Sequence, residues 1–346
     1  MKKLSKLMAV VLAVAMVLAL AACGSTGGAA SAPAASGSGA ASGSGSAAPA
    51  GDGQTYKIGI CQLVQHEALD AANQGFQDAL TEKLGDAVKF DDQNASGDSA
   101  NCSTIVNGFA SDGDDLILAI ATSPLQAAAA ATADIPVLGT AVTDYATALE
   151  ISDWSGTVGT NVSGTSDLAP LDQQAEMLHD LFPDAKNVGL LYCSAEPNSV
   201  YQCTVIEGYL KELGYNVTWY AFNDTNDVTS VTETAADNSD VIYIPTDNTA
   251  ASNTEAIANV VLAKKVPVIA GEEGIARGCG VAALSISYYD LGYQTGLMAY
   301  DILANGADVS TMAVQTAPSV TKKYNAANAE ALGITIPDDY EAIAED

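Results

Sequence analysis

The chain has 346 residues and is strongly acidic, with 13 lysine and arginine residues against 42 aspartate and glutamate residues and a formal net charge of −29. An anionic surface repels polyanions, so nucleic acid is excluded as a partner. Hydrophobic residues make up 48% of the chain and charged residues 16%, which allows a large apolar core. Arg277 is the single arginine, and this argues against a phosphate or sulfate site built from several arginine forks.

The first 22 residues have the layout of a secretory signal, because three lysines precede an uninterrupted apolar stretch from Leu7 to Ala22. The stretch runs into the sequence LAACG, whose cysteine is Cys23. This order of residues resembles the bacterial lipobox, in which the cysteine is lipidated and becomes the mature N-terminus after cleavage. We therefore expect a signal peptide over 1–22 and a membrane anchor of diacylglycerol and palmitate on Cys23, since stable anchoring needs several acyl chains. A plain secretory signal or a membrane anchor helix is the alternative.

The segment after Cys23 has the composition of a linker. Residues 24–53 contain only glycine, alanine, serine, threonine and proline apart from Asp52. Such a composition cannot bury apolar surface and is typical of a flexible coil. We therefore expect the lipidated cysteine and a flexible linker over 23–53 to tether a folded part.

Five further cysteines and two histidines are the residues that could form disulfides or hold a transition metal. The five cysteines contain no Cys-x-x-Cys pair and are odd in number, and two histidines are too few for a metal site. Cys193 and Cys203 lie at an expected strand end and one turn into the next helix, so they could pair in an extracytoplasmic compartment. The alternative is that the cysteines are small buried hydrophobic residues.

From Tyr56 onward, short β-branched runs alternate with helical stretches, a pattern that predicts parallel sheets covered by helices. In the first half we expect strands over 57–60, 88–90, 116–120 and 136–138, with helices around 75 and 105 and after 124. In the second half we expect strands over 187–191, 216–219, 240–244 and 266–269, with a helix around 208. The first helix of each half ends in leucine followed by glycine. The same features thus recur in the same order, and the chain contains two similar halves.

These halves predict an α/β fold with two doubly wound, Rossmann-like lobes and a ligand cleft between them. A strand and a long helix over 281–304 and a tail follow the second half, as expected if the chain crosses back between the lobes. We expect an N-terminal lobe over 54–162 plus about 286–312. The C-terminal lobe is then 163–285 plus about 313–346.

The loops at the carboxyl ends of the strands are the expected ligand site. In the loop Thr122-Ser123-Pro124, a hydroxyl residue at the N-cap and proline at the first helical position present helix N–H groups that suit a carboxylate. The alternative is a cap that serves only its own helix. The equivalent loop of the second half carries Asp247, which suits an ammonium group, and Glu273 is a second candidate for that role. Together the two sites fit a zwitterion such as an α-amino acid.

The other candidate ligand residues share a position in strand-end loops or at the start of the following helix. They are Gln62, Glu67, Thr143, Asp144, Ser194, Asn198, Ser199, Thr246, Asn248 and Tyr288. Among them, Gln62, Glu67, Asn198 and Tyr288 are expected to shape the side-chain pocket, although a tyrosine there could also simply pack its helix. The sequence contains no P-loop, Rossmann glycine fingerprint or nucleophile-elbow motif. We therefore expect no catalytic residue, no metal and no cofactor.

Six stretches of sequence carry a resemblance to a known family. They read KIGICQ from Lys57, HEALD from His66, NASGD from Asn94, AIATSP from Ala119, SAEPNS from Ser194 and YIPTDNT from Tyr243. They are similar to the tryptophan/tyrosine-type (TrpX-like) ABC transporter substrate-binding lipoproteins. The resemblance covers 56–337 and implies a type I periplasmic-binding-protein fold with three crossovers between the lobes.

That resemblance also implies a function and partners. We expect an extracytoplasmic, monomeric lipoprotein at the bacterial cell membrane that captures an amino acid, aromatic in this family, and delivers it to an ABC permease and its ATPase. A purine-nucleoside or sugar binder on the same fold stays open, because Asn248 and Asp144 could bind hydroxyl groups. A sensory binding module is a further alternative. An extracellular hydrolase would need a nucleophile with its base, and no Ser-His-Asp order supports one.

Overall fold

A computed structural model of the chain describes residues 55–344. The expected signal peptide over 1–22, the expected lipidation of Cys23 and the expected linker over 23–53 lie outside the described residues. Within them, the chain forms two separate β-sheets with helices packed on them. We call the first sheet and its helices the first lobe, and the second sheet and its helices the second lobe.

The first sheet contains six strands that pair in parallel. In spatial order they are β11 (Gln315–Thr316), β5 (Val162–Ser166), β4 (Val137–Val142), β3 (Leu116–Ile120), β1 (Tyr56–Gln62) and β2 (Val88–Asn94). The central strands β3 and β4 are buried along their whole length. Their continuous apolar sequences follow from this position, because a parallel sheet has helices on both faces.

The second sheet contains seven strands. In spatial order they are β13 (Glu341–Ala342), β12 (Thr321–Tyr324), β10 (Ala282–Ser285), β9 (Val268–Ala270), β8 (Val241–Ile244), β6 (Asn187–Cys193) and β7 (Asn216–Phe222). Only the β10–β12 pair is antiparallel among the described strands of this sheet. The core of β6, β8 and β9 therefore repeats the parallel arrangement of β1, β3 and β4, as the two similar halves predict.

Helices cover both sheets. Those of the first lobe are α1 (Glu67–Leu84), α2 (Ser99–Asp112), α3 (Thr122–Ala131), α4 (Tyr145–Ala148) and α11 (Tyr288–Asn305), with short 3₁₀ turns η1 (Gly85–Ala87) and η2 (Val309–Thr311). Those of the second lobe are α5 (Leu171–Leu181), α6 (Pro197–Glu212), α7 (Val228–Asn238), α8 (Asn248–Ala251), α9 (Thr254–Lys264), α10 (Glu273–Gly278) and α12 (Ala326–Leu332).

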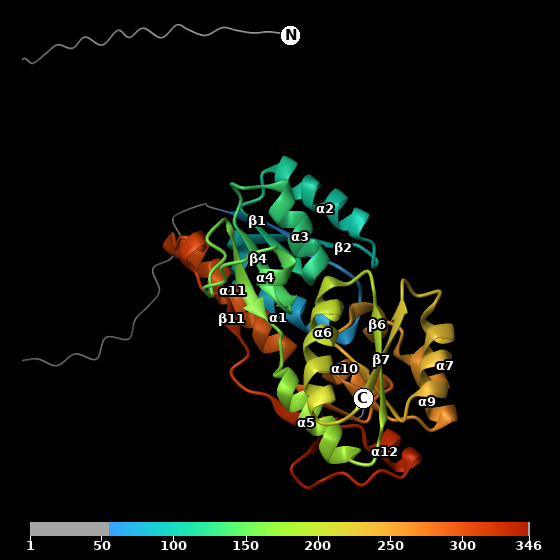
Figure 1. Ribbon diagram of the computed structural model, residues 1–346. Helices are drawn as coiled ribbons and strands as arrows, with labels where there is room; N and C mark the ends of the chain where they lie inside the picture. Colours follow the sequence, from blue (N-terminus) through green and yellow to red (C-terminus); the bar gives the residue numbers. More distant parts are fainter. Residues whose placement is uncertain (1–54, 345–346) are drawn as a thin grey trace, which may run out of the picture. The chain divides into compact units, whose positions relative to one another are not determined.

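Helices α1 and α11 pack closely although they come from opposite ends of the described chain (Figure 1). Glycines make this approach possible: a Cβ on Gly292 would lie 1.8 Å from the carbonyl oxygen of Ala72, and one on Gly75 would lie 2.1 Å from that of Tyr289. Any side chain at either glycine would push the helices apart. The first lobe is thus completed by a helix that follows the whole central part of the second lobe.

The chain crosses between the lobes three times among the described residues. It leaves the first sheet after β5, returns between β10 and α11, and leaves again between β11 and β12. The sequence analysis places the first boundary at 162–163, whereas β5 pairs with β4 through Ser166, so the first crossover follows Ser166. It places the last boundary near 312, whereas β11 pairs with β5 and moves that crossover beyond Thr316. Short edge strands with few apolar residues leave little signal in the sequence.

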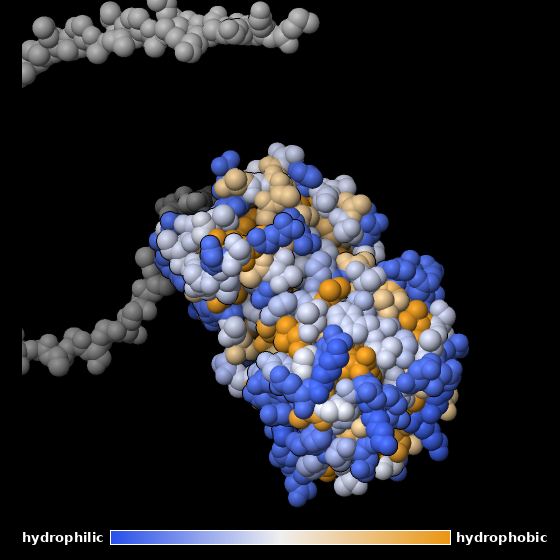
Figure 2. Space-filling view, in the orientation of Figure 1, coloured by the Kyte–Doolittle hydropathy of each residue, from blue (hydrophilic) through white to orange (hydrophobic). Residues whose placement is uncertain are grey.

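The acidic residues lie mostly on the surface. Figure 2 shows hydrophilic residues over much of the second lobe, in the lower part of the view, with hydrophobic residues in small groups. Five acidic side chains are buried among the described residues: Asp114, Asp167, Glu196, Asp247 and Glu272. All except Asp114 follow the carboxyl end of a strand. The buried charges are therefore concentrated where the sequence analysis expects the ligand.

The five cysteines of the described residues are all free and buried. The pairing of Cys193 with Cys203 that the sequence leaves open is therefore not formed, and both thiols belong to the apolar cores of the second lobe. The described part of the chain contains no cluster of three or more histidine, cysteine or acidic side chains that could hold a metal ion. None of its helices combines the length and the hydropathy needed to cross a membrane.

Candidate functional site

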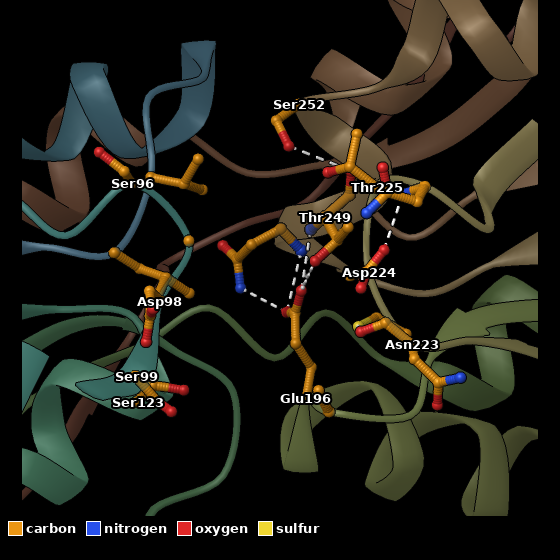
Figure 3. Close-up of a pocket in the computed structure, with 17 residues that line it drawn as sticks. Ser96, Asp98, Ser99, Ser123, Glu196, Asn223, Asp224, Thr225, Thr249 and Ser252 are labelled. Atoms are coloured by element: carbon orange, nitrogen blue, oxygen red, sulfur yellow. Dashed lines mark hydrogen bonds between the residues drawn. The ribbon is translucent and has the colours of Figure 1, made fainter. Parts of the chain in front are cut away.

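A cavity of about 430 Å³ lies between loops of the two lobes, within the range of small-molecule pockets, roughly 300–1,000 Å³. Ser96, Asp98 and Ser123 line it from the first lobe, and Glu196 and Asp224 line it from the second (Figure 3). Hydroxyl groups and carboxylates thus face one another across the cleft. No lysine or arginine is among the described residues that line this cavity, so its walls favour a ligand with a positively charged group.

Glu196 is the buried acid in the wall of this cavity. Its carboxylate accepts hydrogen bonds from the backbone and side-chain nitrogens of Asn248 at 3.0 and 2.7 Å, and from the backbone nitrogen and hydroxyl of Thr249 at 2.8 and 2.7 Å. Figure 3 shows these bonds meeting at Glu196. Since Asn248 and Thr249 begin α8, Glu196 fixes the start of this helix beside the loop that follows β6.

Asp247, which the sequence predicts as the ammonium ligand, lies just before α8 and is 1% exposed. Its Oδ1 accepts a hydrogen bond from the Ala250 N–H at 2.8 Å, and its Oδ2 accepts one from the Cys193 N–H at 2.6 Å. Burial, with a smaller contribution from the Glu196 charge, raises the pKa of Asp247 to about 8 against the effect of these two donors. Both oxygens are thus occupied by backbone groups, and the role in ligand binding stays a prediction.

Glu272 repeats this arrangement at the next helix. It is the N-cap residue of α10, and its carboxylate accepts hydrogen bonds from the N–H groups of Gly274 at 2.6 Å and Ile275 at 2.5 Å. Burial raises its pKa to about 7. Glu196, Asp247 and Glu272 thus all use their oxygens to cap short helices of the second lobe.

Several contacts join the two lobes directly. Arg277 in α10 donates from Nε and Nη2 to the two carboxylate oxygens of Glu67 in α1, at 2.9 and 2.8 Å. His66 Nε2 lies 3.2 Å from Asn248 Oδ1. Arg277 also donates to Glu273 at 3.1 Å. Glu67 and Glu273, both predicted ligand residues, are therefore partners of the single arginine.

The predicted helix start at Ser123 is displaced. The sequence places Ser123 at the N-cap and Pro124 at the first helical position, whereas α3 begins at Thr122 with Ala121 as the N-cap residue. Ala121 has a φ of +90° and cannot cap the helix with its side chain. Its carbonyl already accepts the Leu125 N–H at 3.2 Å, which starts the helix early. Ser123 still lines the cavity, in the first turn of α3.

The remaining predicted residues fall into three groups. Asn248 lines the main cavity with Ser123, while Glu67, Glu273 and Tyr288 line a smaller one of about 190 Å³. Thr122, Thr143, Asn198 and Ser199 are buried and Thr246 is half-buried, and none of them lines either cavity. Gln62 bonds to Asp70 and Asn73, Asp144 caps α4 through the Thr147 N–H, and Ser194 bonds to Asn223.

Part of the cavity wall is not among the residues predicted from the sequence. Asp98 and Ser96 follow β2, and Asn223 to Asn226 follow β7, and all of these residues line the main cavity. The signal that could have found them is the rule already applied to the other strands, since both segments follow the carboxyl end of a strand. β2 and β7 are the edge strands of their sheets, and the loops that follow them both line the main cavity.

Comparison with known proteins agrees with this geometry. The family model of the ABC transporter substrate-binding proteins matches residues 57–346. The chain belongs to this family. Membership confirms the expected resemblance, and it places the protein outside the cytoplasm as the binding component of an ABC transporter.

Individual relatives cover most of the chain. A tyrosine-binding protein of Clostridioides difficile (strain R20291) is 38% identical over 262 residues, 75% of each chain. The structure of an ABC domain from Streptococcus pneumoniae in complex with L-Trp has 34% identity and a TM-score of 0.79, over 82% of this chain and 97% of that one. A leucine-binding protein from Thermotoga maritima, at 16% identity and a TM-score of 0.55 over 74% of this chain and 84% of that one, shares the fold. The expected two-lobed, type I periplasmic-binding-protein fold is confirmed.

Proposed function

We propose that this substrate-binding protein captures an aromatic amino acid between its lobes and delivers it to the membrane permease and ATPase of an ABC importer. The observation that carries the proposal is that the two walls of the cavity present different chemical groups. One wall presents Ser123 at the start of α3, a helix whose first N–H groups no side chain caps, and the other presents carboxylates. The uncapped helix start suits a carboxylate, and a cavity lined by acidic residues without lysine or arginine attracts a ligand that carries an ammonium group.

Two relatives support the amino-acid class and the aromatic side chain. One is named as a tyrosine-binding protein and another was solved with L-Trp. A cavity of about 430 Å³ has room for an aromatic amino acid. We propose that the bound ligand is released chemically unchanged, because no acid and base pair with a nucleophile is found among the residues that line the cavity.

Calorimetric titration of the purified full chain tests this function. The ligand panel is tyrosine, tryptophan, phenylalanine, leucine, glucose, ribose and adenosine. We expect saturable binding of at least one aromatic amino acid and recovery of the intact ligand. Silence toward every amino acid, with heat from a sugar or from adenosine, would replace this function by the alternative on the same fold.

We further propose that residues 1–22 are removed, that Cys23 is lipidated with diacylglycerol and palmitate, and that the anchored protein acts as a monomer. The support is the sequence pattern around Cys23. In bacteria that express the chain, Cys23→Ala should move it from the membrane fraction to the soluble extracytoplasmic fraction without changing ligand affinity. Membrane retention of the variant, or a dimer by light scattering, would contradict the corresponding part of this proposal.

A further inference from the structure

Asp167 is a buried carboxylate with one oxygen unused. It directly follows β5, at the first crossover to the second lobe, and is 3% exposed. Its Oδ2 accepts a hydrogen bond from the Tyr288 hydroxyl at 2.9 Å. Its Oδ1 has no hydrogen-bond partner among the described residues, and the ion pairs of the described residues do not include it.

The buried Asp167 carboxylate lacks a hydrogen-bond donor for Oδ1. Leaving a buried charged oxygen without a donor costs free energy, so such groups normally have a partner. Burial raises the pKa of Asp167, while the hydroxyls of Tyr288 and Thr143 oppose the rise. A donor supplied by a bound ligand would give Oδ1 the partner that it lacks, and a cationic donor would favour the charged form.

Two predicted ligand residues, Thr143 and Tyr288, interact with the Asp167 carboxyl. Thr143 follows β4 and acts on the Asp167 carboxyl. Tyr288 begins α11, bonds to Asp167 and also contacts Thr246, which follows β8 in the second lobe. Tyr288 additionally lines the smaller cavity between the lobes. Asp167 is thus bonded to a residue that lines the smaller cavity and that also contacts the second lobe.

The buried carboxylates of the second lobe, and the half-buried one of Glu273, do not offer the same chemistry. The oxygens of Asp247 and Glu272 accept backbone N–H groups, and Glu273 accepts from Arg277 and from the Ser285 hydroxyl. An ammonium group reaching any of them would compete with bonds already made. Asp167 needs no such exchange, because its Oδ1 is unoccupied.

We propose that Asp167 Oδ1 accepts a hydrogen bond from the α-ammonium group of the bound amino acid, with the Tyr288 hydroxyl orienting the carboxylate. This inference rests on the proposed function and names the residue that recognises the ammonium group. Asp167 then replaces Asp247 in the role that the sequence suggests for the latter. Closure of the lobes over the ligand would bring the ammonium group to Asp167 Oδ1 and complete the ion pair.

Asp167→Asn tests the inference against a matched control. The asparagine keeps the shape of the side chain and an acceptor for the Tyr288 hydroxyl, but it removes the charge. The control is Asp114→Asn, which removes another buried carboxylate of the first lobe. Asp114 precedes β3, at the ends of the strands opposite to the cleft, and forms an ion pair with Lys57. The ligands are L-tyrosine or L-tryptophan, whichever binds more tightly, and its des-amino counterpart, 3-(4-hydroxyphenyl)propionate or indole-3-propionate. We expect Asp167→Asn to weaken amino-acid binding about 100-fold and to change des-amino binding little. Asp114→Asn should leave both affinities unchanged.

The outcomes separate the two proposals. Unchanged amino-acid affinity in Asp167→Asn, or an equal loss for both ligands, overturns the assignment of Asp167 while the function stands. Failure of the unaltered chain to bind any amino acid overturns the function and this inference together.

A second measurement needs only the unaltered chain. Because a bound ammonium lowers the pKa that burial has raised, amino-acid binding should release more protons than des-amino binding, measured over a series of pH values by calorimetry in buffers of different ionisation enthalpy. The facing groups are the hydroxyls of Thr143, Tyr145 and Tyr288 and the carboxyl of Glu272, whose pKa is raised to about 7. The des-amino ligand approaches the same groups without a cation and should release fewer. Equal proton release with both ligands would overturn the inference.

Discussion

The two lobes place buried carboxylates at the same positions, the carboxyl ends of strands, yet use them differently. In the second lobe, the carboxylate oxygens of Glu196, Asp247 and Glu272 accept hydrogen bonds from the N–H groups at the starts of α8 and α10. In the first lobe, Asp167 keeps one oxygen unused. The cause is the length of the connection: α8 and α10 start directly after Asp247 and Glu272, whereas α5 starts only at Leu171. Asp247 and Glu272 each cap the helix that begins at the next residue, whereas no helix begins beside Asp167.

Among the substitutions, the largest expected effect is on stability, from Asp247→Ala. The substitution leaves the buried N–H groups of Cys193 and Ala250 without acceptors, so we expect a loss of about 3 kcal/mol in the free energy of unfolding. Asp144→Ala removes a more exposed cap, at the Thr147 N–H of α4, and should cost only about 1 kcal/mol. Urea unfolding measures both. Lost ligand affinity in Asp247→Ala at unchanged stability would instead support the sequence-based role as an ammonium ligand.

The second prediction concerns pH. The pKa values of Asp247 and Glu272 are raised in the folded chain to about 8 and about 7, above their ordinary values near 4. The folded state then binds more protons than the unfolded state between these limits, so stability falls as pH rises from about 4 through 7 to 8, by up to about 1.4 kcal/mol per pH unit for each proton. Urea midpoints at pH 5, 6, 7 and 8 should decrease.

Glu272→Gln sharpens this pH test. The variant should lose less stability than the unaltered chain between pH 5 and 7. Glu330→Gln, at an exposed position of the same lobe, should show the same decrease in urea midpoint as the unaltered chain. An unchanged slope in Glu272→Gln would mean that its carboxylate is charged throughout this range.

The third prediction concerns the ligand-facing wall of the first lobe. The Ser123 hydroxyl lines the cavity and forms none of the hydrogen bonds found among the described residues. Ser123→Ala should therefore weaken amino-acid binding about 10-fold, as for one lost hydrogen bond to a charged group, and change stability by less than about 0.5 kcal/mol. Ser103→Ala in α2, away from the cavity, is the matched control. Calorimetry measures the ligand affinity and urea unfolding measures the stability of the same samples. A loss of stability without a loss of affinity would show that Ser123 does not bind the ligand.

The smallest expected effect concerns the ion pair between the two lobes. Glu67→Gln weakens the pair with Arg277 across the cleft, and because this pair is partly exposed it contributes no more than about 1 kcal/mol. We expect ligand affinity to fall up to about 5-fold. Glu82→Gln, on the same helix but bonded to Tyr293 within the first lobe, should have no effect. Tighter binding in Glu67→Gln would show that the bridge opposes closure.

Much of the fold follows from the sequence. The apolar runs at 116–120 and 187–191 are strands because only a sheet covered on both faces buries such segments, and the recurrence of the pattern predicts two lobes. The crossovers at Ser166 and Thr316 are less predictable. β11 has two exposed residues, and its place beside β5 depends on tertiary contacts rather than on local composition.

The site follows from the sequence only in outline. The strand-end rule locates Ser123 and Asn248 at the cavity, but the direction of a carboxylate depends on which N–H groups lie beside it. Asp247 immediately precedes the start of α8 and caps this helix, so its ligand role stays a prediction. Asp167 was missed because its neighbours Thr143 and Tyr288 reach it from distant parts of the chain.

The packing of α1 against α11 has a consequence for how the chain is made. α1 is synthesised first among the described helices, yet its partner is complete only at Asn305, and the first sheet only at Thr316. A growing chain therefore carries an unpaired apolar helix face until most of the second lobe has been translated. A premature stop before residue 288 would consequently damage the lobe that begins the chain, by leaving Ala72, Phe76 and Leu80 uncovered, while the central strands of the other lobe would already be present.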